Sequence, residues 1–80
     1  MNHNPSLAKV FGDVLKELRL ERGFTQEQLA DLAMLNDRSH VSMIERAIKS
    51  PMLPTIFALA KAMNISASEL ICLVETRLSR

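Results

Sequence analysis

Hydrogen-bonding side chains of the types that contact DNA bases lie together in residues 38–46 of this 80-residue chain. They are Arg38, Ser39, His40 and Ser42. An arginine can donate two hydrogen bonds to a guanine, and a hydroxyl can contact a base edge or a phosphate. Val41 and Ile44 have the spacing of the inward side of a helix. The segment is therefore a candidate for an element that enters a DNA groove, although many helix pairs share this pattern.

Catalytic and metal-binding chemistry has no comparable set of residues. His3 and His40 are not spaced as metal ligands with a cysteine or with each other. Cys72 falls in an apolar stretch, where a thiol more often packs than reacts. The two glycines are isolated, so the sequence has no phosphate-cradling loop. We therefore expect no enzymatic activity, no bound metal and no cofactor.

Charge is distributed unevenly along the chain, although the formal net charge is only +1. Residues 13–31 carry five acidic side chains against three basic ones, whereas residues 38–61 carry four basic ones against Glu45 alone. A basic segment of this kind suits phosphate groups. Taken alone, the pattern is more typical of an ordinary solvated surface.

Length and composition predict one globular domain over residues 1–80. Hydrophobic residues make up 48% of the chain and charged residues 24%, a balance typical of folded rather than disordered sequences. No apolar run approaches the roughly 20 residues that cross a bilayer, and the N-terminal MNHNPS lacks the pattern of a signal peptide. We therefore expect a cytoplasmic protein that does not bind membranes.

Apolar residues at three- and four-residue spacing, separated by capping residues, predict five helices and no strand. The helices should run from about Pro5 to Arg22, Thr25 to Met34, Arg38 to Arg46, Leu53 to Met63, and Ala67 to Leu78. Thr25 with Gln28, and Ser66 with Glu69, have the spacing of capping boxes. Gly23 and Asn64 suit the positive φ at which helices often end. The expected fold class is all-α.

The same spacing predicts the side chains of the core. We expect buried residues at Leu7, Val10, Phe11, Val14, Leu15 and Leu18, at Leu29, Ala30, Leu32 and Ala33, and at Ile56, Phe57, Leu59, Ala60 and Met63. Leu70 and Ile71 are expected to close this core from the last helix.

Residues 25–46 read as a helix, a short turn and a second helix, which is the helix-turn-helix arrangement. The segment FTQEQLADLA at residues 24–33 resembles the first of these helices in the phage-repressor family, also called Cro-like or XRE. VSMIER at residues 41–46 resembles the core of its recognition helix, and residues 51–70 match its later helices. The resemblance covers about residues 7–72. It implies a five-helix lambda-repressor-like domain and a small regulator such as a restriction-modification controller protein.

Two features depart from the pattern of the family. The turn between Ala33 and Val41 carries one extra residue, near Asn36 and Asp37, which shifts the frame in which the following side chains meet DNA. Ala47 stands where a glycine commonly ends the recognition helix. Either Ala47 adopts a strained conformation or the helix continues slightly further.

The resemblance implies a set of DNA-contacting residues: Gln26, Arg38, Ser39, His40, Ser42, Met43, Arg46 and Lys49. Gln26 would hold a phosphate or orient a neighbouring side chain. Arg38 and Ser39 would read base edges, with a phosphate contact as the alternative for Arg38. Arg46 and Lys49 would contact phosphates. His40 and Met43 are about as well explained by packing within the protein.

A structural ion pair is implied as well. The glutamate that matches Glu45 pairs in the family with an arginine of the first helix, here Arg19. Such a pair would attach the recognition helix to the rest of the domain.

The function that these residues imply is sequence-specific binding of a palindromic double-stranded operator by a dimeric transcriptional regulator. The alternative is an antitoxin-type module that neutralises a partner toxin and represses its own operon. Binding of RNA is disfavoured, since aromatic residues make up only 4% of the chain and leave little for base stacking.

The dimer interface is expected on the last helix, residues 67–78. Leu70, Val74 and Leu78 recur every four residues, which makes a continuous apolar stripe. With Leu70 in the core, we expect Leu73, Val74 and Leu78 to stay uncovered and to pair with a second copy across a two-fold axis.

Overall fold

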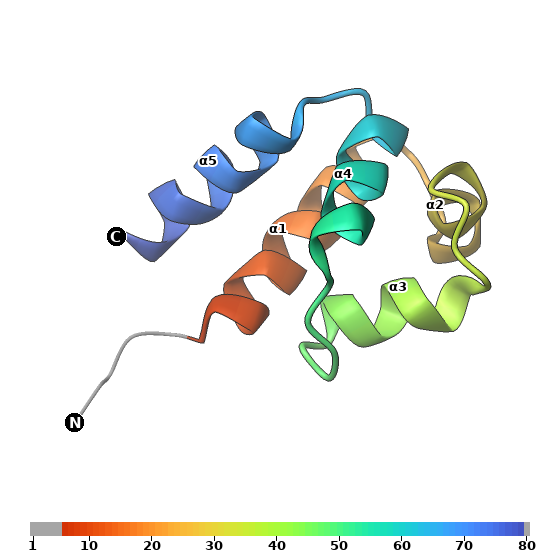
Figure 1. The fold of residues 1–80 in the computed structure, drawn as a ribbon, viewed down its shortest axis with the longest axis horizontal. Coiled ribbons are helices and arrows are strands. Elements are labelled where there is room, and N and C mark those ends of the chain that lie inside the picture. Colours follow the sequence, from red (N-terminus) through yellow and green to blue (C-terminus); the bar gives the residue numbers. More distant parts are fainter. Residues whose placement is uncertain (1–5, 80) are drawn as a thin grey trace.

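The computed structural model describes residues 6–79, which form five helices and no strand (Figure 1). They are α1 (Leu7–Glu21), α2 (Gln26–Leu32), α3 (Arg38–Glu45), α4 (Leu53–Ala62) and α5 (Ala67–Leu78). The prediction of an all-α, five-helix fold is confirmed. The expected start near Pro5 lies outside the described residues. Helix α1 begins after Ser6, whose hydroxyl oxygen accepts a hydrogen bond from the N–H of Lys9.

Helix α1 lies at the centre of the molecule. Figure 1 shows α5 returning alongside it, α4 crossing in front of it, and α2 and α3 together at the opposite side from α5. Fully buried side chains from all five helices meet in one core: Leu15, Leu29, Val41, Ile44, Leu59, Met63, Leu70 and Val74. Because α3 contributes to this shared core, its orientation is tied to that of the whole domain.

The predicted caps are present at the helix starts. Thr25 and Gln28 form a capping box at α2, and Ser66 and Glu69 form another at α5. Asp37 is the N-cap of α3, where its side chain accepts a hydrogen bond from the N–H of Ser39. Each cap satisfies backbone donors that the first helical turn leaves without partners.

Helices α1, α2, α3 and α4 all end with the same backbone motif. A residue with positive φ follows each helix, and the N–H of the next residue bonds back to a carbonyl in the last turn. The four residues are Gly23, Met34, Ala47 and Asn64. The predictions for Gly23 and Asn64 are confirmed, and Ala47 adopts the left-handed conformation with a φ of 61°. These sharp endings keep α3 short, with Glu45 as its last residue.

Several core predictions are wrong. Leu7, Leu32 and Phe57 were expected inside, but they are 62%, 54% and 57% exposed, respectively. Apolar residues occur on all sides of α4, so their spacing does not define which side faces inward. Leu32 lies to the side of the arc that Leu29 and Ala30 bury, and α2 ends there rather than at Met34.

The predicted exposed stripe on α5 is also wrong. Val74 is only 2% exposed and belongs to the core, and Leu78 is partly buried against that core. The four-residue recurrence of Leu70, Val74 and Leu78 marks the side of α5 that packs on α1 and α4. Leu73 is exposed as expected, at 44%, but the expectation that Ile71 closes the core is wrong, since Ile71 is 38% exposed.

No single helix within residues 6–79 has the length and apolar character needed to cross a membrane. The α4–α5 pair reaches that length only as two segments bent by 102°.

A buried ion pair joins α1 to the end of α3. The guanidinium of Arg19 donates from Nε to Oε2 of Glu45 at 2.7 Å and from Nη2 to Oε1 at 3.1 Å. Its Nη1 donates to the carbonyl oxygen of Phe24 at 2.8 Å, so one guanidinium from α1 binds both the α1–α2 turn and α3. Arg19 and Glu45 are only 7% and 9% exposed. The ion pair implied by the family resemblance is present.

Ala47→Gly should raise the free energy of unfolding by about 0.5–1 kcal/mol, because glycine adopts positive φ without the steric cost of a Cβ. Chemical denaturation measures the change. Ala58→Gly, inside α4, is the matched control and should lower stability by a similar amount. A destabilised Ala47→Gly protein would contradict the assigned conformation of Ala47.

Glu45→Ala should lower the free energy of unfolding by about 3–5 kcal/mol, because it leaves the buried guanidinium of Arg19 without its counter-charge. A double-mutant cycle with Arg19→Ala should show that the double variant loses much less than the sum of the two single changes. The exposed Lys9–Asp13 pair is the control cycle, with an expected coupling of about 0.3–0.5 kcal/mol. Additive effects at Arg19 and Glu45 would show that the pair contributes no coupling.

Candidate nucleic-acid interface

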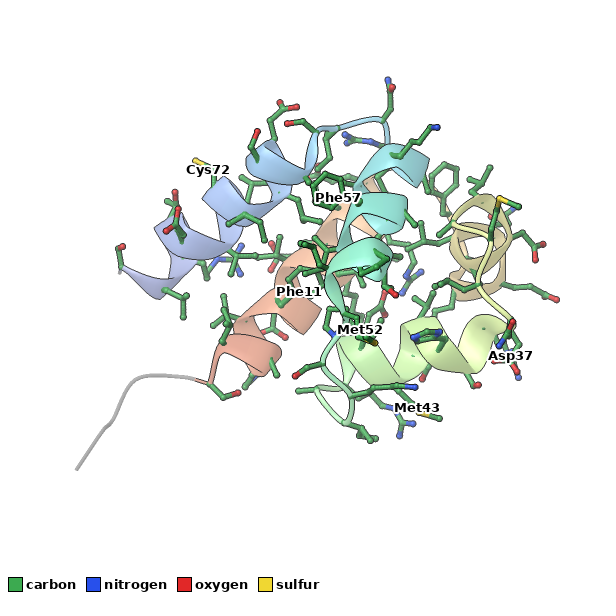
Figure 2. The ribbon with its side chains drawn as sticks, in the orientation of Figure 1. Phe11, Asp37, Met43, Met52, Phe57 and Cys72 are labelled. Atoms are coloured by element: carbon green, nitrogen blue, oxygen red, sulfur yellow. The ribbon has the colours of Figure 1, made fainter. Side chains whose placement is uncertain are left out.

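One side of α3 is turned away from the domain. Val41, Ile44 and Glu45 are buried, and the opposite side of the helix carries Ser39, Ser42, Met43 and Arg46. Figure 2 shows Met43 on the side of α3 that faces away from α1 and α4. Ser39 and Arg46 are exposed, whereas Ser42 and Met43 are half-buried. The structure therefore brings these four predicted DNA-contacting residues onto one outward side, which we call the α3 outer face.

His40 and Arg38 lie at the edges of the α3 outer face. His40 is half-buried, which agrees with a share in packing, and Arg38 is exposed in the first turn. Arg38 directly follows Asp37, which lies where the turn carries its extra residue. The start of α3 therefore has an exposed acidic side chain next to an exposed basic one.

Asp37 binds the first turn of α3 through its carboxylate. Its Oδ1 accepts hydrogen bonds from the hydroxyl and from the N–H of Ser39. These bonds, the hydroxyl first, hold the pKa of the Asp37 carboxyl below its ordinary value of 3.8. Because the folded pKa is lowered, the cap contributes its full stabilisation above pH 3.8 and loses it as the pH falls through the lowered value.

Gln26 at the start of α2 contacts the buried ion pair. Its side-chain Nε2 donates to Oε1 of Glu45 at 3.1 Å, and the side chain is partly buried. One carboxylate therefore accepts hydrogen bonds from α1 and from α2 while belonging to α3. Of the two roles that the resemblance implies for Gln26, this contact supports the orientation of a neighbouring side chain.

The exposed charges between residues 38 and 61 are all positive. Glu45 is the only acid in this segment, and Arg19 neutralises it in the interior. The basic residues are Arg38, Arg46, Lys49 and Lys61, and each is exposed. None of them takes part in the ion pairs formed among residues 6–79. Residues 38–61 therefore carry four exposed basic side chains and no exposed acidic one, although the exposed Asp37 directly precedes them.

Gly12 was not singled out by the sequence, but it positions the end of α3. A Cβ at Gly12 would lie 2.6 Å from the carbonyl oxygens of both Ile44 and Glu45. Only glycine lets the backbone of α1 approach the last turn of α3 this closely. An isolated glycine inside an apolar helix was the one available signal, since glycine is unfavourable there without a packing reason.

Other chemistry has little support within the described residues. No three His, Cys, Asp or Glu side chains among residues 6–79 gather in a way that could hold a metal ion, and His3 lies outside this range. Cys72 is exposed on the outer side of α5, away from α3 (Figure 2).

Comparison with known proteins agrees with this geometry. The profile of the helix-turn-helix family matches residues 15–70. The immunity repressor protein of Bacillus phage phi105 is 42% identical over 60 residues, which are 75% of this chain and 41% of the repressor. The chain therefore spans less than half the length of that relative.

Two solved structures of restriction-modification controller proteins are similar over most of the chain. C.AhdI from Aeromonas hydrophila is 43% identical with a TM-score of 0.75, covering 79% of this chain and 94% of that protein. C.Esp1396I, solved as a tetramer in complex with its natural 35 base-pair operator, is 28% identical with a TM-score of 0.85. That match covers 95% of this chain and 99% of the other. The chain belongs to the XRE-type, phage-repressor-like helix-turn-helix family of DNA-binding transcriptional regulators.

Proposed function

We propose that this protein binds a palindromic double-stranded operator as a dimer, with α3 of each copy in the major groove. The observation that carries the proposal is the α3 outer face, which is polar apart from Met43, turned away from the core and bordered by the exposed positive charges of Arg38 and Lys49. A helix of this kind fits the major groove, and the basic side chains that flank it can bind the phosphates on either side of the groove. A protein that acts on bacterial operator DNA would work in the cytoplasm.

Each residue of the interface is proposed to have a distinct task. Arg38, Ser39 and Ser42 contact base edges, because their donors and acceptors lie on or beside the α3 outer face. Met43 contacts a thymine methyl group, and His40 supports the edge of the helix. Arg46 and Lys49 bind phosphates, since both are exposed bases near the end of α3. Gln26 positions Glu45 and thereby fixes the angle of α3.

Dimerisation is proposed to use a surface other than the uncovered stripe first expected on α5. Five of the large exposed apolar side chains belong to α1, to α4 with its N-cap, and to α5: Leu7, Met52, Leu53, Phe57 and Ile71. We call them the apolar patch. Leu7 and Ile71 line one groove of about 410 Å³ with Pro51, which precedes α4, and Ile56 in its first turn. Met52 and Phe57 lie along α4 in Figure 2, next to those groove residues in the sequence.

A second copy of the chain is the occupant that fits the apolar patch. Monomeric proteins rarely leave large apolar side chains gathered in this way. A palindromic site requires a two-fold dimer whose two α3 helices lie about 34 Å apart, one turn of DNA. The patch shares no residue with the α3 outer face, so both surfaces can be used at once.

Binding to a selected operator should be strong, sequence-specific and steeply weakened by salt, because lysine and arginine contacts release counterions from DNA. Arg38→Ala should relax the preference at particular base pairs and cost about 1–3 kcal/mol of binding at those positions. Lys49→Ala should weaken binding to all sequences about equally.

Titration of labelled operator and scrambled DNA at two salt concentrations measures these effects. Equal affinity of the unaltered protein for both sequences would refute operator binding. A uniform loss from Arg38→Ala would assign Arg38 to a phosphate instead of a base.

Phe57→Glu and Ile71→Glu should each convert the dimer to a monomer at micromolar concentration and weaken operator binding. Leu73→Glu is the matched control, because Leu73 is equally apolar and similarly exposed but lies on the other flank of α5. Sedimentation velocity distinguishes the two states. An unaltered protein that remains monomeric at tens of micromolar would contradict the dimer. Loss of the dimer in Leu73→Glu alone would place the interface on the flank of α5 that carries Leu73, opposite the apolar patch.

A further inference from the structure

The first turn of α3 has a fixed hydrogen-bonding polarity. A carboxylate accepts hydrogen bonds and does not donate, so the contact between the Ser39 hydroxyl and Oδ1 of Asp37 requires Ser39 to be the donor. The N–H of Ser39 is also directed to Oδ1 of Asp37, at 3.0 Å. A serine hydroxyl has a single hydrogen. Its oxygen therefore offers only lone pairs to any further partner.

Asp37 has the same polarity. It is exposed, and both of its hydrogen bonds from Ser39 are accepted by Oδ1, so Oδ2 takes no part in that contact. A carboxyl with the ordinary pKa of 3.8 is already ionised at neutral pH, and the pKa of Asp37 is lower still, so Asp37 cannot donate. Two neighbouring groups at the start of α3 thus present hydrogen-bond acceptors to the surroundings.

Major-groove base edges differ in this respect. Guanine offers acceptors at O6 and N7 and thymine an acceptor at O4, whereas cytosine and adenine each offer an exocyclic amino group. A pair of acceptors on the protein can accept a hydrogen bond from an amino group, whereas it repels a carbonyl oxygen.

Building on the proposed function, we propose that Asp37 and Ser39 act together as a specificity-determining pair that selects a base with a major-groove amino group, cytosine or adenine. The Asp37–Ser39 hydrogen bond prevents the hydroxyl from rotating to donate to guanine or thymine. Arg38 lies between them in sequence and has only donors, so it suits a guanine at an adjacent position. The first turn of α3 therefore recognises cytosine or adenine at one position and guanine at the adjacent position.

Base analogues test the pair directly. After selection of a bound sequence from random DNA, each adenine is replaced by purine deoxyribonucleoside and each cytosine by the 2-pyrimidinone deoxyribonucleoside, which lack the amino group. Affinities are measured for the unaltered protein and for Ser39→Ala, so that weakened base pairing in the analogue affects both equally. At one position in each half-site, removal of the amino group should cost the unaltered protein about 5- to 100-fold in affinity. The same replacement should cost Ser39→Ala much less.

Asp37→Asn separates base reading from helix capping. Asparagine is as good an N-cap as aspartate, so α3 should stay folded, while the side-chain amide adds a donor. Discrimination between the amino base and guanine or thymine at that position should fall at least about fivefold. If Ser39→Ala and Asp37→Asn change stability alone and keep the base preference, the two residues are a helix cap only and the inference is wrong. Absence of any sequence preference in the unaltered protein would instead remove the proposed operator function.

Discussion

The buried ion pair between Arg19 and Glu45 is the interaction on which the placement of the recognition helix depends. Two charges at this depth are costly to remove from water, and they are stable there because each has hydrogen-bond partners of suitable geometry. Arg19 also binds the carbonyl of Phe24, and Gln26 also binds Glu45. The contacts therefore join α1, α2 and α3 in directions that apolar packing alone does not specify. Gly12 complements them by letting the α1 backbone meet the last turn of α3.

This arrangement also determines the charge of the surface. The single acid of residues 38–61 is taken into the interior, so the same side chain that orients α3 is absent from the surface that would meet phosphates. The Asp37 cap and the sharp ending at Ala47 limit α3 to eight residues and place the exposed Arg46 and Lys49 directly after it. Orientation, length and charge of α3 thus follow from a few residues that do not themselves face outward.

The sequence predicted local features well, because they depend on neighbouring residues. The caps at Thr25 and Ser66, the endings at Gly23 and Asn64, and the helix count all follow from short-range geometry. The inward sides of α4 and α5 were predicted less well: Phe57 is exposed and Val74 is buried. Both helices carry apolar residues on more than one side, so only the tertiary contacts decide which side is covered. The Arg19–Glu45 pair came from family resemblance, since a separation of 26 positions in the sequence hides it from any local pattern. The close approach at Gly12 became visible only with the chain folded.

We propose that α3, held in place by the Arg19–Glu45 pair, is the element that contacts DNA. Titration of the isotopically labelled protein with a selected operator duplex, followed by backbone amide shifts in NMR spectra, tests it most directly. The account predicts that the largest changes occur at Gln26, along residues 37–43 and at Arg46–Lys49. The amide of Leu73 and the outer side of α5 near Cys72 should change little. Changes concentrated on α5 or on the exposed side of α1, with α3 unaffected, would contradict the account.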